Sequence, residues 1–209
     1  FDGIDIALFS AGGGTSKQFA PVATQAGAVV IDNSSTFRMD KSVPLVVPEI
    51  NAVDVAKHKG IIANPNCTTI VTLMALHPLH RAFGVKRIFA STYQAVSGSG
   101  AMGIVELEQQ VKALARGHRV KKEVYPHQIA FNALPHVDVF LENGYTKEEM
   151  KMVLETRKIM GLEQVPISAT CVRVPVERAH SESIQVTTES PLELGAIQDA
   201  FERAPGLQV

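Results

Sequence analysis

Short apolar runs alternate with segments of helical character over the first 64 residues, and this alternation constrains the fold more than any other feature. Four of the runs are typical of buried strands: residues 4–9, 28–31, 45–47 and 61–63. Two helices are expected between them, from about residue 17 to residue 26 and from Asn51 to Gly60. Continuous apolar strands that alternate with helices predict a parallel sheet covered on both faces. The predicted fold class is therefore α/β, with a partial Rossmann-type sheet.

From residue 67 onward the pattern mixes helices with β-rich segments. The expected helices are residues 67–83, 101–116, 146–160 and a last one from about 190, and the expected β-rich segments are residues 87–94, 167–176 and 183–188. Pro78 is expected to kink the first of these helices or to end it early. Thr146 and Glu149 have the spacing of a capping box, whereas residues 118–128 are expected to form an exposed loop. We therefore expect two domains, residues 1–66 and residues 67–209, the second of them an incomplete α+β domain.

The composition is that of an ordinary soluble globular protein, with 45% of the 209 residues hydrophobic and 20% charged. A formal net charge of -1 and the absence of a long basic run argue against nucleic acid as a partner. No apolar stretch approaches the ~20 residues that span a bilayer, so no membrane partner is expected. The two cysteines form no disulfide framework and have no partner at metal-ligand spacing. We therefore expect a cytoplasmic protein without a metal site.

The chain begins without an initiator methionine directly before the first apolar run, and it stops shortly after the last expected helix. We expect it to be the central part of a longer protein. The glycines at residues 12–14, which follow the first strand, either let the backbone approach a phosphate or simply form a tight turn. They do not form a GxGxxG dinucleotide fingerprint, which would have to lie upstream of Phe1.

The segment from Asn64 to Thr69 joins a strand to an apolar helix and contains Cys67. The first N–H groups of a helix lack backbone partners and lie at the positive end of the helix dipole. Because that environment favours the thiolate, Cys67 is placed like a nucleophile. The alternative interpretation is that a small cysteine merely fills the corner between strand and helix.

A thiol nucleophile needs a proton carrier, and His180, one of seven histidines, follows a strand at a turn. Arg173 stands within a β-branched strand, where its guanidinium is either a bidentate clamp for a carboxylate or part of the solvent face of an edge strand. Cys171 in the same strand is interpreted as a packed, inert thiol.

Three more charged residues are candidates for a ligand-binding site. Glu148 and Lys151 are three apart on one helix, where a surface ion pair is the common explanation. Arg38 lies in a loop beyond a strand, which is where parallel sheets place the groups that contact ligands.

Taken together, these segments resemble aspartate-β-semialdehyde dehydrogenase, and more closely its bacterial form. The matching segments run in the family's order over essentially the whole chain: residues 10–12, 32–38, 47–51, 64–69, 91–98, 129–135, 171–175 and 180–183. Compared with that family, the chain lacks the first βαβ unit, which carries the Gly-rich cofactor loop, and the C-terminal part of the second domain. The resemblance implies a partial NADP-binding domain over residues 1–66, a catalytic and dimerisation domain over residues 67–209, and a homodimer built on the second domain.

The resemblance also implies a reaction, the NADPH-dependent reductive dephosphorylation of L-β-aspartyl phosphate to L-aspartate-β-semialdehyde, in lysine, threonine and methionine biosynthesis. It implies that Cys67 forms a thioester, that His180 is the acid/base group, and that Asn66 with backbone N–H groups stabilises the oxyanion. The implied substrate ligands are Gln94 for the acyl group, Arg173 for the α-carboxylate, Glu148 for the α-amino group, and Arg38 with Lys151 for the phosphate. The implied cofactor contacts are Ser97 and Gly98 near the nicotinamide, and Ser10, Gly12 and Asn33 near the rest of NADP.

Two other readings of the chain stay open. N-acetyl-γ-glutamyl-phosphate reductase uses the same thioester logic, but its acylated substrate has no free ammonium for Glu148. A catalytically inert fragment that acts only as an interaction module is the alternative from a different class.

Overall fold

The computed structural model describes all 209 residues, and the chain forms two compact units. Unit 1 comprises Phe1–Arg87, Lys151–Pro166 and Val186–Val209, and unit 2 comprises Ile88–Met150 and Ile167–Gln185. The expected division into domains at residue 67 stays a prediction.

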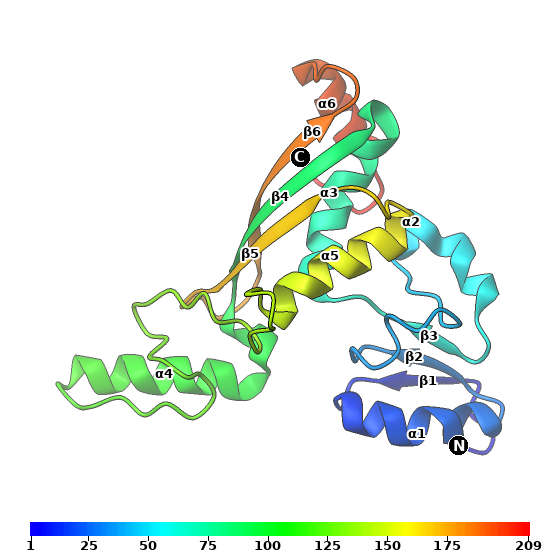
Figure 1. The fold of residues 1–209 in the computed structure, drawn as a ribbon. Coiled ribbons are helices and arrows are strands. Elements are labelled where there is room, and N and C mark those ends of the chain that lie inside the picture. Colours follow the sequence, from blue (N-terminus) through cyan, green and yellow to red (C-terminus); the bar gives the residue numbers. More distant parts are fainter. The chain divides into compact units, whose positions relative to one another are not determined.

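Unit 1 contains a parallel sheet of three strands in the order β1 (Ile6–Phe9), β2 (Val29–Asp32) and β3 (Ile61–Ala63). Helix α1 (Gly13–Gln25) lies along this sheet (Figure 1). Small side chains allow the close approach, because Ala20 and Ala23 of the helix are fully buried in one apolar cluster with sheet residues. The parallel order confirms the predicted α/β class.

Residues 45–47 were expected to form a third strand, but only Leu45 makes a parallel bridge, to Ala63. The N–H of Val46 donates to the carbonyl of Ala63 at 3.1 Å and the N–H of Ala63 donates to the carbonyl of Pro44 at 2.9 Å, but the pairing ends there because a helix begins at Pro48. The side chain of Asn51 binds the other edge of this segment: it accepts from the N–H of Val47 at 2.9 Å and donates to the carbonyl of Leu45 at 2.9 Å. The expected helix from residue 51 to residue 60 is wrong too: the chain forms the short α2 (Pro48–Asn51) and then the 3₁₀ helix η1 (Ala52–Lys57).

Helix α3 (Cys67–Phe83) follows the prediction at both ends. The side chain of Asn66 caps its first turn, and Gly84 ends it with a φ of 67°. Pro78 lies inside the helix and does not end it early. The helix contacts α6 (Leu194–Glu202), and its Leu73 belongs to the main apolar cluster of the unit.

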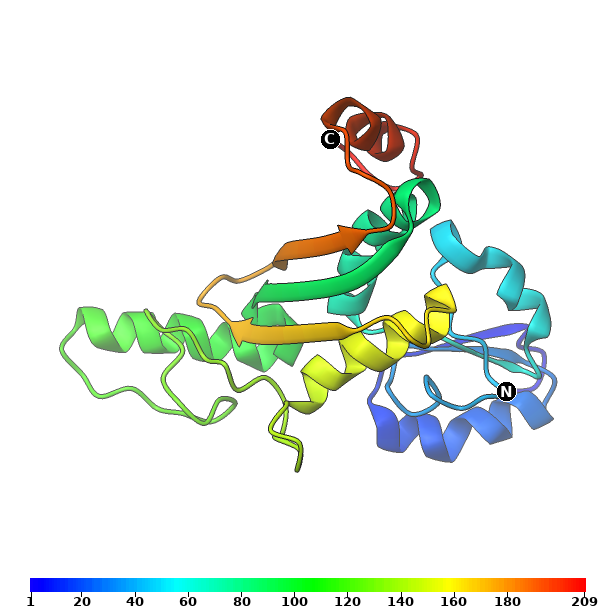
Figure 2. The ribbon, with the colours of Figure 1, turned by 45° about the horizontal axis from the view of Figure 1, so that its top comes forward.

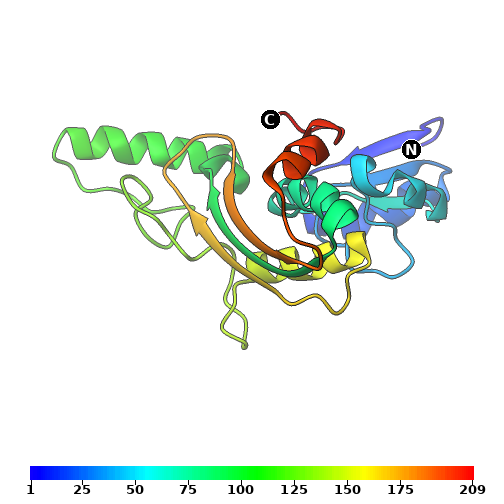
Figure 3. The same cartoon turned by 90° about the horizontal axis from the view of Figure 1, so that it is seen from above.

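The second sheet has the strand order β5 (Ile167–Arg173), β4 (Val85–Gln94) and β6 (Ser181–Thr188). The three strands lie side by side in Figure 2 and curve together when seen from above in Figure 3. β4 and β5 are parallel, in a register that pairs Gln94 with Arg173. This register brings the ends of both strands to the same edge of the sheet, where the predicted substrate ligands of unit 2 lie.

Three further helices complete the described elements: the 3₁₀ helix η2 (Val96–Ser99), α4 (Ala101–Ala115) and α5 (Lys147–Met160). The predicted capping box at the start of α5 is confirmed: the N–H of Thr146 donates to Glu149 Oε2 at 2.6 Å, and the N–H of Glu149 donates to Thr146 Oγ1 at 3.3 Å. The expected loop at residues 118–128 is irregular, as predicted. No helix combines the length and the apolar character needed to cross a membrane.

Candidate active site

Cys67 is the first residue of α3 and is exposed to solvent. Its neighbours in the first turn, Thr68 and Thr69, are fully buried. The Cys67 Sγ lies 3.9 Å from Thr68 Oγ1, a hydroxyl that can donate to sulfur. The thiol is thus fixed at a helix start, where it is accessible to a substrate, as a nucleophile requires.

Asn66 holds the start of this helix. Its Oδ1 accepts hydrogen bonds from the backbone N–H groups of Thr68, at 3.0 Å, and Thr69, at 3.3 Å. Since the carbonyl end of the amide is used by the helix, the Nδ2 group is the donor end of this side chain. The two backbone N–H groups that Asn66 caps already have an acceptor in its side-chain carbonyl.

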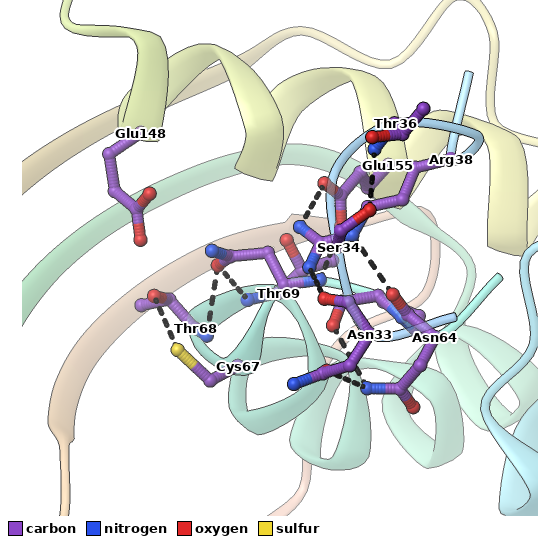
Figure 4. A network of polar contacts seen from close by, with 12 residues as sticks. Asn33, Ser34, Thr36, Arg38, Asn64, Cys67, Thr68, Thr69, Glu148 and Glu155 are labelled. Atoms are coloured by element: carbon purple, nitrogen blue, oxygen red, sulfur yellow. Dashed lines mark hydrogen bonds and ion pairs between the residues drawn. The ribbon is translucent and has the colours of Figure 1, made fainter. Parts of the chain in front are cut away.

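Arg38 is buried, and three of its donors bind protein acceptors, as Figure 4 shows. Nε donates to the carbonyl of Asn64 at 2.9 Å, Nη2 donates to the carbonyl of Asn33 at 2.9 Å, and Nη1 donates to Glu155 Oε1 at 3.0 Å. A guanidinium has five N–H donors, so these contacts leave two of them unused. Burial raises the pKa of Glu155, against the opposing effects of Arg38 and the N–H of Asn66, and Lys151 contributes a smaller opposing charge.

A row of polar side chains follows the ends of the three strands in unit 1. Ser10, Asn33 and Asn64 each come directly after a strand, and their side chains are joined: Asn64 Nδ2 donates to Asn33 Oδ1 at 2.8 Å, and Asn33 Nδ2 donates to Ser10 Oγ at 3.3 Å. Gly12, at the start of α1, has a φ of 88°, and a Cβ at this position would meet nothing within 4 Å. Polar groups and open backbone at the carboxyl ends of parallel strands suit a polar cofactor such as NADP.

In unit 2, Gln94 is 1% exposed and lies between two other polar side chains. Its Nε2 donates to Glu148 Oε1 at 3.1 Å, and its Oε1 accepts from Thr92 Oγ1 at 3.1 Å. Glu148 is itself buried, which excludes the interpretation of this glutamate as an exposed surface residue. A buried carboxylate suits an ammonium ligand, because a buried charge is costly unless it is paired with an opposite charge.

Ala95 connects Arg173 and His180 through its backbone. Its carbonyl accepts from Arg173 Nη1 at 2.7 Å, and its N–H donates to His180 Nδ1 at 3.0 Å. A Cβ on Gly98 would come within 2.7 Å of Arg173 Nη1 and 3.3 Å of His180 Nε2, so the absence of a side chain at Gly98 allows both groups to approach the backbone closely. Arg173 is 6% exposed, which excludes the solvent-face interpretation and favours the carboxylate clamp.

Burial lowers the pKa of His180, and the charge of Arg173 lowers it further, whereas Glu148 acts in the opposite direction. The ring is therefore held in its neutral form near neutral pH. Because Nδ1 accepts the N–H of Ala95, the neutral ring carries its hydrogen on Nε2.

Cys171, unlike the exposed Cys67, is fully buried. Burial raises the pKa of its thiol to about 12, against the opposing effect of a hydrogen bond with Thr92. The interpretation of Cys171 as a packed and inert thiol agrees with this environment.

The structure thus forms two clusters of predicted site residues. Unit 1 contains Cys67, Asn66, Arg38 and Lys151 together with the polar row at the strand ends, and unit 2 contains Gln94, Glu148, Arg173, His180, Ser97 and Gly98. Sequence reasoning missed Glu155, which contacts Arg38 and Asn66, and the backbone of Ala95, which contacts Arg173 and His180. The only sequence signal for Glu155 was an acidic residue on an otherwise ordinary amphipathic helix. The roles of the individual residues stay predictions.

Comparison with known families gives two matches in sequence order. Residues 1–58 match the family described as "Semialdehyde dehydrogenase, NAD binding domain", and residues 76–209 match "Semialdehyde dehydrogenase, dimerisation domain".

Individual relatives agree with these matches. The chain is 58% identical to an aspartate-semialdehyde dehydrogenase of Aquifex aeolicus, over 100% of this chain and 62% of that protein. It is 47% identical to an aspartate-semialdehyde dehydrogenase of Bacillus subtilis, over 99% of this chain and 62% of that protein. Among solved structures, aspartate semialdehyde dehydrogenase II from Vibrio cholerae, complexed with ASA, matches with a TM-score of 0.96 and 48% identity, over 98% of this chain and 61% of that one. The chain therefore spans about 62% of the length of these relatives.

Proposed function

This chain belongs to the semialdehyde dehydrogenase family, and on that premise we propose that it carries the nucleophile and the substrate ligands of an aspartate-semialdehyde dehydrogenase. The proposed reaction is the reductive dephosphorylation of L-β-aspartyl phosphate to L-aspartate-β-semialdehyde, a step in the biosynthesis of lysine, threonine and methionine. One observation carries the proposal: the exposed Cys67 is the first residue of a capped helix, while the other thiol, Cys171, is fully buried.

In the proposed first step, Cys67 Sγ attacks the acyl carbon of the substrate. The new S–C bond forms a thioester, and the C–O bond to the phosphate breaks, so that inorganic phosphate leaves. The negative charge that develops on the acyl oxygen would be stabilised by Asn66 Nδ2. The proposal requires that the thiol proton can reach His180.

His180 is the proposed carrier of this proton. Because its Nδ1 accepts the N–H of Ala95, the neutral ring has its hydrogen on Nε2, and its unprotonated nitrogen is Nδ1. To accept the thiol proton the ring must therefore give up the Ala95 bond, and the charged ring then returns a proton from Nε2 to the oxygen of the reduced adduct.

The substrate's own charges match the buried charged groups. Arg173 would clamp the α-carboxylate with its guanidinium fork, and Glu148 would hold the α-ammonium group. Gln94, which donates to Glu148, would orient the acyl group. The two remaining donors of Arg38 and the ammonium of Lys151 would bind the phosphate.

NADPH, when bound, supplies the hydride that reduces the thioester. Ser10, Gly12 and Asn33 would hold the polar part of the cofactor at the strand ends of unit 1. Ser97 and Gly98 would contact the nicotinamide part, where Gly98 leaves room beside Arg173 and His180. The match to a dimerisation domain supports a homodimer built on the second predicted domain, residues 67–209.

The experiment follows two products of the reaction in the complete protein. With β-aspartyl phosphate alone, we expect release of one phosphate per Cys67, and with NADPH added we expect continuous oxidation of the cofactor. The 209-residue chain by itself should give the single release of phosphate even if it does not oxidise NADPH. No phosphate release from either protein would contradict the proposal and would favour an inert interaction module.

A further inference from the structure

Glu155 is a buried carboxylate with contacts to two predicted site residues of unit 1. It lies in α5 and is 1% exposed. Its Oε1 accepts from Arg38 Nη1 at 3.0 Å, and its Oε2 accepts from the backbone N–H of Asn66 at 2.7 Å. These partners are 117 and 89 residues away in the sequence, so one side chain joins three separate parts of the unit. Figure 4 shows Glu155 beside Arg38.

The contact with Asn66 acts on the turn that carries the nucleophile. The carbonyl of Asn66 accepts from the N–H of Ile70 at 3.0 Å, and its side chain accepts from Thr68 and Thr69. Glu155 binds the backbone N–H of the same residue. Asn66 is therefore held on both sides, and the position of Cys67, the next residue, is fixed with it.

The contact with Arg38 acts on the predicted phosphate ligand. Arg38 also binds the carbonyls of Asn33 and Asn64, so its guanidinium has a single orientation. The loop that carries it is held by Lys158, whose Nζ donates to the carbonyls of Arg38 at 2.7 Å, Asp40 at 2.7 Å and Val43 at 2.9 Å. Lys158 lies one helical turn after Glu155, so the same face of α5 holds both the arginine and its loop.

A carboxylate in this position is costly unless it is well paired, because burial disfavours its charged form. Its two partners are a guanidinium and a backbone N–H, and both favour the carboxylate. A neutral isostere would keep the volume but lose the charge that attracts Arg38. The arrangement is therefore sensitive to the charge of residue 155 as well as to its size.

We propose that Glu155 is a positioning residue, which holds the Asn66–Cys67 turn and the Arg38 guanidinium in one fixed geometry. The inference rests on the proposed function, because it assigns the purpose of that geometry to the attack of Cys67 on an acyl phosphate whose phosphate group contacts Arg38. Glu155 itself touches no reacting atom in this account. It acts through the two residues that it binds.

The contact can be tested without any reaction. In the complete protein, the amide proton of Asn66 should shift with pH as the Glu155 carboxyl titrates, and this shift should disappear in Glu155→Gln. An Asn66 amide that shows no such pH dependence in the wild-type protein would overturn the inference, whatever the enzymatic activity.

The consequence for the reaction is tested by the single-turnover rate at which β-aspartyl phosphate acylates Cys67. We expect Glu155→Gln to lower this rate about tenfold or more, because small displacements of reacting groups carry large rate penalties. Alkylation of Cys67 by iodoacetamide, which needs no phosphate site, should change by less than about threefold. Glu155→Asp keeps the charge and should recover part of the acylation rate. If Glu155→Gln does not fold, the same acylation rate is measured in Glu155→Asp, where a smaller loss is expected.

Glu106→Gln is a matched control in unit 2. Glu106 is also buried and also accepts backbone N–H groups, from Glu123 at 2.8 Å and from Val124. This variant should lower the melting temperature but not the acylation rate.

Acylation of Glu155→Gln within about twofold of the wild-type rate, or an equal loss of acylation rate in Glu106→Gln, would overturn the inference. If the wild-type protein is not acylated at all, the proposed function fails, and the Asn66 amide measurement alone decides whether Glu155 holds this turn.

Discussion

The backbone N–H of Ala95 donates a hydrogen bond to Nδ1 of His180 at 3.0 Å. A histidine nitrogen that accepts an N–H carries no hydrogen of its own, so the neutral ring has its hydrogen on Nε2. A charged ring has a hydrogen on both nitrogens and would face the N–H of Ala95 with a second donor. The contact therefore fixes both the tautomer and the preferred charge of the proposed acid/base residue.

The tautomer can be measured by ¹⁵N NMR of the histidine side chains. For His180 we expect an unprotonated Nδ1 and a protonated Nε2 in the resting protein at neutral pH. The resonances are assigned by their loss in His180→Asn. A ring with its hydrogen on Nδ1 would contradict the arrangement seen in the structure.

The environment of His180 also predicts how the folding stability of the protein depends on pH. The folded-state pKa of His180 lies below its ordinary value of 6.5, because burial and Arg173 disfavour the charged ring. In the unfolded chain the ring takes up a proton near pH 6.5, so protonation favours unfolding. The contribution of this residue is present above pH 6.5 and is lost as the pH falls through 6.5 toward the folded-state pKa. Urea unfolding at several pH values should show less of this loss in His180→Asn, and an identical pH profile in both proteins would exclude this contribution.

Arg173→Lys should chiefly raise the KM for the amino-acid substrate, because lysine keeps the charge but loses the planar fork that binds a carboxylate in two places. Steady-state kinetics with aspartate semialdehyde and phosphate measure this directly. The comparison variant is Arg178→Lys, which changes an exposed arginine of the same unit. A large fall in kcat with KM unchanged would mean that Arg173 stabilises the transition state and does not bind the α-carboxylate in the ground state.

Glu148→Gln should weaken the preference for a free α-ammonium group, since the buried carboxylate is the proposed partner of that charge. We expect a lower kcat/KM for β-aspartyl phosphate and no comparable loss for an N-acylated analogue, which has no ammonium. Equal losses for both substrates would remove Glu148 from recognition of the amino group. Higher activity of the wild-type protein on an N-acylated γ-glutamyl phosphate would favour the related reductase instead.

Local sequence signals predicted the elements that depend on neighbouring residues. The bounds of α3 followed from Asn66 and Gly84, and the start of α5 followed from the capping box of Thr146. The strand predicted at residues 45–47 is limited to one bridge because a helix begins directly after it, at Pro48. Apolar character alone does not reveal that interruption.

The candidate site was predictable in its residue types but not in its contacts. Cys67, Arg173 and His180 stood out through position or through the family resemblance. Glu155 did not, because its partners Arg38 and Asn66 are far away in the sequence and nothing local distinguishes it from an exposed helix glutamate. Pairing across such separations is set by tertiary packing, which a single sequence does not display.

The most direct test of the account is the site of covalent labelling by a β-aspartyl phosphate analogue, located by peptide mass spectrometry. We predict a single acyl adduct on Cys67 that is lost in Cys67→Ala, while Cys171→Ala, which changes the buried thiol, keeps it. An adduct on Cys171, or labelling that persists in Cys67→Ala, would contradict the assignment of Cys67 as the nucleophile.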